Sequence, residues 1–355
     1  MTIKDVARLA GVSPATASQA LNGHPRVHAT TRQRVVDAAA QLRYAPNLHG
    51  RRLARRRAEC LAVVQGRNLA TVFSDSFYRV VLGGVAETIH ARGFSLVITP
   101  APRTGATRAD LVRALGQGSV DGALVVGVPD DDWLLALLDR QLPLVLVDTH
   151  IPGMAVPAVS PDYAEGARLG TAHLLGLGHR RVAFLGAAVA YPFGRETAEG
   201  YTAALAEAGV RPEPDLVGRA DIGVEPATAA TRALLAASPP PTALFAVTDV
   251  MAIGAIRAAR AQGLRVPEDL AVVGMDDVEL SGYFDPPLTT VRIAKEEMGR
   301  VAAERLMALI EAPDGPDGGA GVVRVAPELV VRASSGPSGP AAEGAREPAR
   351  ASPAP

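Results

Sequence analysis

The chain is poor in the residues that mark disulfide-rich, metal-binding and membrane proteins. Its 355 residues include one cysteine, Cys60, which excludes an intrachain disulfide and a cysteine-based zinc site and fits a reducing compartment. No apolar run approaches the roughly 18 residues that a membrane span requires, and the first 20 residues alternate acids and bases in place of the apolar block of a signal peptide. We therefore expect a cytoplasmic protein without a membrane segment, a metal or a cofactor.

Signatures of catalysis are also missing. The sequence contains no GxSxG or HExxH motif, no Walker A loop and no Cys/His pair placed for nucleophilic catalysis. The segment GLGHRR at 176–181 begins like a dinucleotide fingerprint, but it follows a predicted helix, precedes a predicted strand and lacks the third glycine. Asp276 and Asp277 could form a carboxylate pair, yet adjacent residues leaving a strand point apart more often than together. We predict that the chain is not an enzyme.

What the sequence does have is an uneven distribution of charge. Residues 1–57 contain 11 basic and 2 acidic residues, a formal charge of +9, and because the whole chain carries −1, residues 58–355 carry −10. A basic segment on an acidic body is typical of a nucleic-acid-binding domain, although a basic run can equally be a solvated face. The local pattern of the same segment distinguishes these interpretations.

The opening stretch TIKDVARLAGVSPATASQALN predicts two short helices joined by a tight turn. Thr2 can cap the first helix, in which apolar residues recur at i, i+3, i+4 and i+7, and Gly11 supplies its stop. Ser13 as N-cap and Pro14 at the first helical position favour the second helix, which should run to about Leu21.

A third helix is expected after Thr30 or Thr31 and would complete a small common core. The second helix has one narrow apolar stripe, and the residues that it leaves facing outward are Ala15, Thr16, Ser18 and Gln19. A merely solvated helix would usually expose Glu and Lys there. The pattern therefore favours a helix-turn-helix, whose second helix enters the major groove, over an unspecialised helical bundle.

The run from Thr2 to Leu53, with the segments DVARLAGVS, TASQALN and YAPNLHGRRL, resembles the DNA-binding domain of the LacI/GalR family of bacterial repressors. The resemblance implies that Pro14, Ala15 and Gln19 read bases. Gln19 can pair bidentately with adenine, whereas Ala15 offers only a methyl contact. The residues that the resemblance places on DNA bases, phosphates or the minor groove are Ser13, Pro14, Ala15, Thr16, Ser18, Gln19, Asn22, Arg26, Asn47, Arg51 and Leu53.

Residues 46–59 are expected to form a hinge helix and a linker, following the helix-turn-helix domain at 1–45. In the family this helix folds only when two protomers dock on DNA, and Leu53 matches the leucine that wedges into a minor-groove step. Alternatively, Leu53 packs on its own domain. Gly50 stands where the family usually has alanine and weakens helix propensity by about 1 kcal/mol, so the hinge should depend strongly on DNA and dimer contacts.

From residue 60 to about 332, apolar runs alternate with amphipathic segments, which predicts an α/β fold of two parallel sheets with helices on both faces. The runs are CLAVV, FSLVI, GALVV, PLVLVD, RRVAFLG, TALFAV and DLAVVG. The family resemblance continues through SPDYAEGARLGTAHLLGLGHRRVAFL and DPPLTTVR and implies a two-lobed periplasmic-binding-protein-like core with ligands between the lobes. We expect one lobe at about 60–160 and 293–320, and the other at about 161–292 and 321–332.

The resemblance also implies an effector site. Asp162, Asp249 and Asp276 stand at family-matching positions, where carboxylates can accept paired hydrogen bonds from vicinal hydroxyls, or else cap helices. Thr197 replaces the usual arginine and Ile293 a frequent glutamine, so the pocket should suit a neutral sugar or nucleoside. The predicted effector-binding residues are Asp75, Phe77, Asp162, Phe193, Arg195 as a candidate substitute for the missing arginine, Thr197, Thr248, Asp249, Asp276, Tyr283 and Ile293.

Residues 333–355 contain no leucine, isoleucine, valine or aromatic residue and are predicted to be disordered. They lack the leucine-rich helix through which some relatives form tetramers, so we expect a homodimer. Together the patterns predict a ligand-responsive repressor of carbohydrate or nucleoside utilisation that binds a pseudo-palindromic operator. The alternative is a regulator whose core responds to a protein partner or to no effector.

Overall fold

The computed structural model divides the chain into two units, residues 1–59 and 60–355. The residues that it describes are 1–21, 24–44, 57–65, 76–101, 105–127, 131–187, 192–312 and 321–336. The predicted site residues outside these ranges are Asn22, Asn47, Arg51, Leu53 and Asp75. Within the described ranges, we find no helix with the length and apolarity needed to span a membrane.

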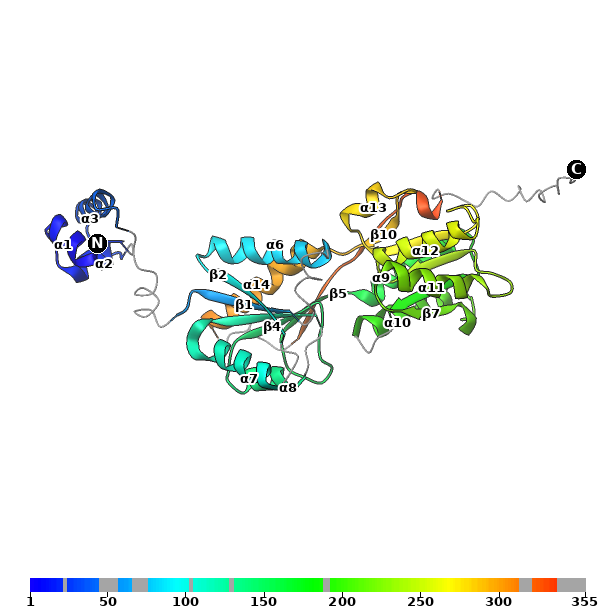
Figure 1. The fold of residues 1–355 in the computed structure, drawn as a ribbon, viewed down its shortest axis with the longest axis horizontal. Helices are drawn as coiled ribbons and strands as arrows, with labels where there is room; N and C mark the ends of the chain where they lie inside the picture. The colour runs from blue at the N-terminus through cyan, green and yellow to red at the C-terminus, as the bar shows by residue number, and fades with distance from the viewer. Residues whose placement is uncertain are drawn as a thin grey trace, which may run out of the picture. The chain divides into compact units, whose positions relative to one another are not determined.

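The described part of the N-terminal unit contains the helices α1 (Ile3–Ala10), α2 (Pro14–Leu21) and α3 (Ala29–Gln41) (Figure 1). At the start of α1 the Asp5 carboxylate accepts a hydrogen bond from the Thr2 backbone N–H at 2.9 Å, and Gly11 ends the helix with a φ of 65°. The three helices share one core, made of Val6, Ala7, Ala10, Ala17, Ala20, Val27, Val35, Ala38 and Ala39. The predicted helix-turn-helix geometry is confirmed.

In its described residues the C-terminal unit contains two sheets of six strands each, one for each lobe. The strands of the first sheet are β1 (Cys60–Gln65), β2 (Ser95–Pro100), β3 (Gly122–Val126), β4 (Leu144–Val147), β5 (Ala158–Pro161) and β11 (Val322–Val325). The strands of the second are β6 (Val182–Ala187), β7 (Val217–Ala220), β8 (Ala243–Ala246), β9 (Ala271–Asp276), β10 (Thr289–Arg292) and β12 (Glu328–Val330). Their orders are β11-β5-β4-β3-β1-β2 and β12-β10-β9-β8-β6-β7, and all neighbours are parallel except β10 and β12. Each apolar run quoted from the sequence coincides with one of these strands.

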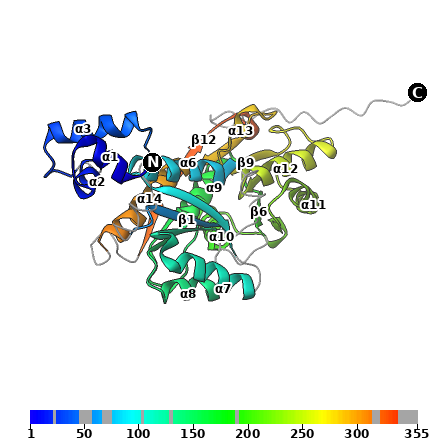
Figure 2. The same cartoon turned by 60° about the vertical axis from the view of Figure 1, so that its left-hand side comes forward.

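Helices cover both faces of each sheet, as the continuous apolar strands require. Their bounds are α6 (Ser76–Ala91), α7 (Gly105–Ala114), α8 (Asp131–Leu138), α9 (Tyr163–Gly176), α10 (Pro192–Glu207), α11 (Val224–Leu235), α12 (Asp249–Ala261), α13 (Glu279–Tyr283) and α14 (Lys295–Glu311). In the first lobe α6 and α14 share one face and α7 and α8 the other (Figures 1 and 2). In the second lobe α9 pairs with α10, and α11 pairs with α12.

The close packing of α6 against α14 depends on two glycines. A Cβ on Gly84 would lie 2.2 Å from the Glu296 carbonyl oxygen, and a Cβ on Gly299 would lie 2.1 Å from that of Val81. Only glycine allows the two backbones to approach this closely. The first residues of both helices are thereby held over the carboxyl end of the first sheet.

The expected lobe bounds differ from the structure in the last segment, residues 321–332, which was expected to lie wholly in the second lobe. The chain leaves the first lobe after β5 and enters the second at α9, near the predicted break at 159–162. Residues 322–325 were expected in the second lobe, but β11 pairs in parallel with β5, with Val322 opposite Ala158. Because an apolar strand can join either sheet, long-range pairing alone decides its lobe.

The predicted disorder of the tail is also wrong at its start. Residues 333–335 form a 3₁₀ turn, and Ser334 and Ser335 are buried. Ser334 Oγ donates to the Val272 carbonyl at 2.6 Å and accepts from the Thr289 N–H at 2.8 Å. Amino-acid composition did not predict order in this segment, because the segment is held by hydrogen bonds to the backbone of strands and not by buried apolar side chains. Residues 337–355 lie outside the described part of the chain.

Candidate nucleic-acid interface and ligand pocket

The outer face of α2 carries the predicted base-reading side chains. Ser13 caps the helix by accepting a hydrogen bond from the Thr16 N–H at 3.0 Å. Pro14, Ala15 and Gln19 are exposed beyond this cap. Among the other predicted residues, Thr16 and Ser18 are half-buried and Arg26 is exposed. The turn therefore presents the face of the helix that the sequence pattern predicts.

A cavity lies between the two lobes of the C-terminal unit. Its described lining is mostly aromatic and aliphatic, with two acids, two tyrosine hydroxyls and one threonine. The lining residues are Phe77, Tyr78 and Asp148 from the first lobe, and Tyr163, Phe193, Ile222, Val247, Thr248, Val250, Asp276 and Val278 from the second. No Lys, Arg or His is among these described lining residues, in agreement with the expectation of a less basic, more apolar pocket.

Asp148 connects the two lobes at this cavity. It follows β4 directly, in a left-handed backbone conformation with a φ of 64°. Its carboxylate accepts hydrogen bonds from Tyr78 of the first lobe, at 2.9 Å, and from Tyr163 of the second. Burial and the adjacent negative charge raise the pKa of Tyr163 well above its usual value, so this hydroxyl remains a donor at neutral pH.

Aromatic rings form the walls around this acid. Tyr78 lies edge-on to Phe77, with ring centroids 5.2 Å apart, and Tyr163 lies 5.5 Å from Phe193. The Lys295 Nζ lies 6.0 Å from the Phe77 ring centroid. A cavity with aromatic walls and a few oriented acceptors suits a small ligand with apolar ring faces and hydroxyl groups.

The cavity gathers only part of the predicted effector set. Phe77, Phe193, Thr248 and Asp276 line it. Asp276 stands at the end of β9 with a φ of 125°, another positive value beside the cavity.

The other predicted effector residues lie elsewhere. Asp162 caps α9 by accepting a hydrogen bond from the Glu165 N–H at 3.0 Å, which is the capping alternative. Arg195 is exposed and lies 3.6 Å from Glu199. Tyr283 is 82% exposed at the end of α13, and Ile293 is buried beside a second cavity.

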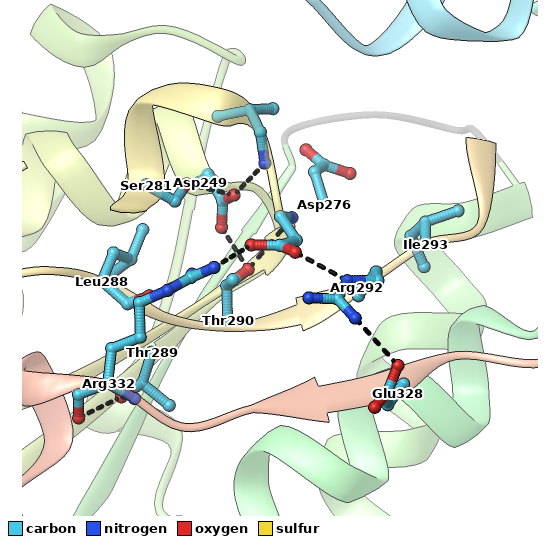
Figure 3. Close-up of polar contacts among 12 residues, drawn as sticks. Asp249, Asp276, Ser281, Leu288, Thr289, Thr290, Arg292, Ile293, Glu328 and Arg332 are labelled. Carbon is cyan, nitrogen blue, oxygen red and sulfur yellow. Dashed lines mark hydrogen bonds and ion pairs between the residues drawn. The ribbon is translucent and has the colours of Figure 1, made fainter. Parts of the chain in front are cut away.

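The predictions that Thr197 and Asp249 contact the effector are wrong, because both side chains are buried and bonded within the fold. The Thr197 side chain is fully buried and donates to the Phe193 carbonyl at 2.8 Å, so it serves α10 itself. Asp249 is also fully buried, and its carboxylate accepts from the Val278 N–H, the Ser281 hydroxyl and the Thr290 hydroxyl (Figure 3). Burial raises the pKa of Asp249. With three donors already bound, this acid organises the loop after β9 instead of facing a ligand.

The adjacent acids Asp276 and Asp277 have different surroundings: Asp276 lines the cavity, whereas Asp277 forms ion pairs with two arginines. Asp277 binds Arg292 at 2.8 Å and Arg332 at 2.6 Å. These two arginines lower the pKa of the Asp277 carboxyl although burial opposes them. Asp277 therefore stabilises the crossover segments, and Asp276 is left at the cavity.

Sequence reasoning missed Tyr78, Asp148 and Tyr163. A signal existed for Asp148, because it directly ends the apolar run PLVLVD, and carboxyl ends of parallel strands meet at the ligand-binding edge of such sheets. No comparable local signal marks the two tyrosines, which reach Asp148 from 70 and 15 residues away. The His179 side chain forms a hydrogen bond with the Thr242 hydroxyl at 2.9 Å, just before β6.

A helix-turn-helix unit joined to two parallel-sheet lobes with a cavity between them defines a class of DNA-binding, ligand-responsive regulators. Comparison with known proteins agrees. The model of "Bacterial regulatory proteins, lacI family" matches residues 2–47, and that of "Periplasmic binding protein-like domain" matches residues 171–335. The HTH-type transcriptional regulator CelR of Thermobifida fusca is 36% identical over 309 residues, which cover 86% of this chain and 91% of CelR.

Two solved structures extend the similarity to three dimensions. A complex of the transcriptional regulator CelR with cellobiose has a TM-score of 0.73 at 34% identity and covers 94% of this chain and 99% of its own. A lac repressor dimer bound to operator and the anti-inducer ONPF has a TM-score of 0.81 at 27% identity, with coverages of 95% and 99%. The chain belongs to the lacI family of bacterial regulatory proteins. It is a DNA-binding transcriptional regulator, which confirms the predicted family and fold class.

Proposed function

We propose that this regulator is a cytoplasmic homodimeric repressor whose effector is an uncharged sugar or nucleoside. The observation that carries the proposal is the interlobe cavity, which has aromatic walls, acceptors at Asp148 and Asp276, and no cation among its described lining residues. A phosphorylated or carboxylated ligand would meet two carboxylates and no cation among the described lining residues. The similarity to a CelR–cellobiose complex supports a sugar.

On DNA, each protomer would place the exposed face of α2 in the major groove of one half-site. Gln19 has the amide that discriminates bases, and the exposed Arg26 would reach a further base edge. Ser13, Thr16 and Ser18 would contact or approach phosphates. Two such units account for a pseudo-palindromic operator, in agreement with the lac repressor dimer on its operator.

The effector would act through the two lobes. Because Asp148 binds a tyrosine from each lobe, a ligand hydroxyl that competes for this carboxylate would change the relative stability of two lobe arrangements. Coupling to DNA then requires that the arrangements differ in how well the two hinge segments pair.

Calorimetry of the full-length protein with matched neutral and phosphorylated sugars tests the proposal. We expect measurable binding of a neutral member and weaker binding of its phosphorylated counterpart. Tighter binding of the phosphorylated sugar, lost in Arg195→Ala, would show that Arg195 forms an anion site and would contradict it. If no sugar or nucleoside binds, a core that responds to a protein partner or to no effector becomes the better account.

A further inference from the structure

Gln65, the last residue of β1, carries a buried amide without a partner. The residue is 1% exposed, and neither its Nε2 nor its Oε1 has a hydrogen-bond partner in the part of the chain that the structure describes. Buried amides in folded proteins are nearly always hydrogen-bonded, because removing one from water without a partner is unfavourable. An apolar residue of the same length would avoid this penalty, so the glutamine calls for a functional explanation.

The strand register places this amide at the ligand-binding edge of the first lobe. Gln65 pairs with Val126 of β3, and Val126 pairs with Val147 of β4, so the three side chains form one row on the same face of the sheet. Val126 and Val147 belong to the core cluster that also contains Phe77 and Tyr78 of α6. The row is therefore on the face that α6 covers.

The residues that follow this row are at the cavity. Asp148 comes directly after Val147 and binds the Tyr78 hydroxyl, and a Cβ on Gly127, the residue after Val126, would lie 3.8 Å from that hydroxyl. Gln65 thus ends its strand at the same edge of the sheet as Asp148, in the row whose valines pack in one core with Phe77 and Tyr78. It is not itself among the described residues that line the cavity.

We propose that Gln65 is a specificity-determining residue of this cavity, where its amide pairs with an uncharged ligand group that presents a donor beside an acceptor. Two neighbouring sugar hydroxyls or the edge of a nucleobase have this chemistry. A carboxylate or phosphate offers acceptors only and would leave the amide oxygen unpaired. The inference rests on the proposed function and adds to it the residue that selects among neutral ligands.

The test uses the full-length protein with cellobiose, ribose and cytidine as probes, binding being measured by calorimetry and stability by thermal unfolding. Gln65→Met keeps the length of the side chain and removes its hydrogen bonds. We expect Gln65→Met to keep or raise the unfolding temperature of the ligand-free protein. We also expect it to lower, by tenfold or more, the affinity for whichever probe the unsubstituted protein binds. The probe affected shows whether the amide selects a sugar or a nucleobase.

Thr171→Val is the matched control. Thr171 is also fully buried, and its hydroxyl has no partner, but it lies two turns along α9 from Tyr163 of the cavity lining. It should leave probe affinity unchanged. Unchanged affinity in Gln65→Met, with binding by the unsubstituted protein intact, would overturn this inference alone. A marked loss of stability in ligand-free Gln65→Met would also overturn the inference, because it would reveal a partner for the amide within the fold. If no probe binds the unsubstituted protein, both this inference and the proposed function are overturned.

Discussion

Among single residues, Gln19 has the most specific predicted role at the DNA interface. Its exposed amide on α2 can donate to and accept from one base edge, whereas Ala15 offers a methyl group only. We expect Gln19→Ala to relax discrimination at one operator position by about 1–3 kcal/mol, and Arg55→Ala, which removes a charge, to weaken all sequences alike. Binding of both variants to a panel of single-mismatch operators measures this. Equal losses on every sequence for Gln19→Ala would refute base reading.

Asp249, unlike Gln19, has a structural role, because its carboxylate accepts hydrogen bonds from groups within the protein. Replacement by alanine leaves one buried N–H and two hydroxyls without their acceptor. We therefore predict that Asp249→Ala lowers the free energy of unfolding by roughly 2–5 kcal/mol, measured by urea denaturation. Arg211→Ala, at an exposed position, should change it by less than about 0.5 kcal/mol. A similarly small effect at Asp249 would contradict the structural role.

Among secondary-structure elements, β11 and α10 connect the lobes through a half-buried ion pair. Arg324 of β11 donates to Glu196 of α10 at 2.7 and 3.0 Å, and His150 lies 3.6 Å from the same carboxylate. The Glu196 side chain is 10% exposed and that of Arg324 is 34% exposed. Breaking a buried pair costs about 3–5 kcal/mol, and partial exposure of the arginine reduces that to roughly 2 kcal/mol.

We therefore predict that Glu196→Gln destabilises the protein by roughly 2 kcal/mol in chemical denaturation. Glu304→Gln is the control, since it removes an exposed ion pair with Arg300 along α14 and should cost below about 1 kcal/mol. If the two variants lose the same free energy of unfolding, burial between the lobes does not strengthen the ion pair of Arg324 with Glu196.

For the whole molecule, the separation of charge predicts a steep salt dependence of DNA binding. Residues 1–57 carry a formal charge of +9, against −10 on the rest of the chain. If a dimer neutralises about six phosphates, the logarithm of the binding constant should fall with the logarithm of salt concentration at a slope of about −5. Fluorescence anisotropy on operator DNA between low and high salt measures the slope. A slope near zero would exclude the phosphate contacts.

Stability of the whole molecule should also depend on pH through half-buried histidines, among them His173 and His179. Burial lowers the pKa of both His173 and His179 below their usual value. Near pH 6.5 the unfolded chain therefore binds protons that the folded chain does not, so stability is full above about pH 7 and falls as pH drops through 6.5. The loss should approach about 1.4 kcal/mol per histidine for each pH unit at most.

Unfolding midpoints at pH 7.5 and pH 5.5 test this, and His179→Gln, which can still bond Thr242, should reduce the difference. Midpoints that agree at the two pH values would show that the histidines titrate alike in both states.

The sequence by itself determined the local architecture of this protein. Caps such as Thr2 and Ser13 and the stop at Gly11 act within a few residues, so the helix-turn-helix could be predicted from neighbours alone. The continuous apolar runs likewise predicted the strands, because a parallel strand buried on both faces has no polar alternation. The family resemblance predicted a cavity that is less basic and more apolar than is usual in the family, and the described lining agrees with this.

Only the tertiary structure decided which partner each ambiguous group takes. Val322 could have joined either sheet, Ser334 could have been solvated, and Asp249 and Asp148 are both acids adjoining a strand end. Long-range packing puts Ser334 on the β9 backbone, encloses Asp249 with three donors, and turns Asp148 toward tyrosines from both lobes. Local patterns cannot make these assignments, because the energy of burying a polar group depends on donors and acceptors that are brought to it from distant parts of the chain.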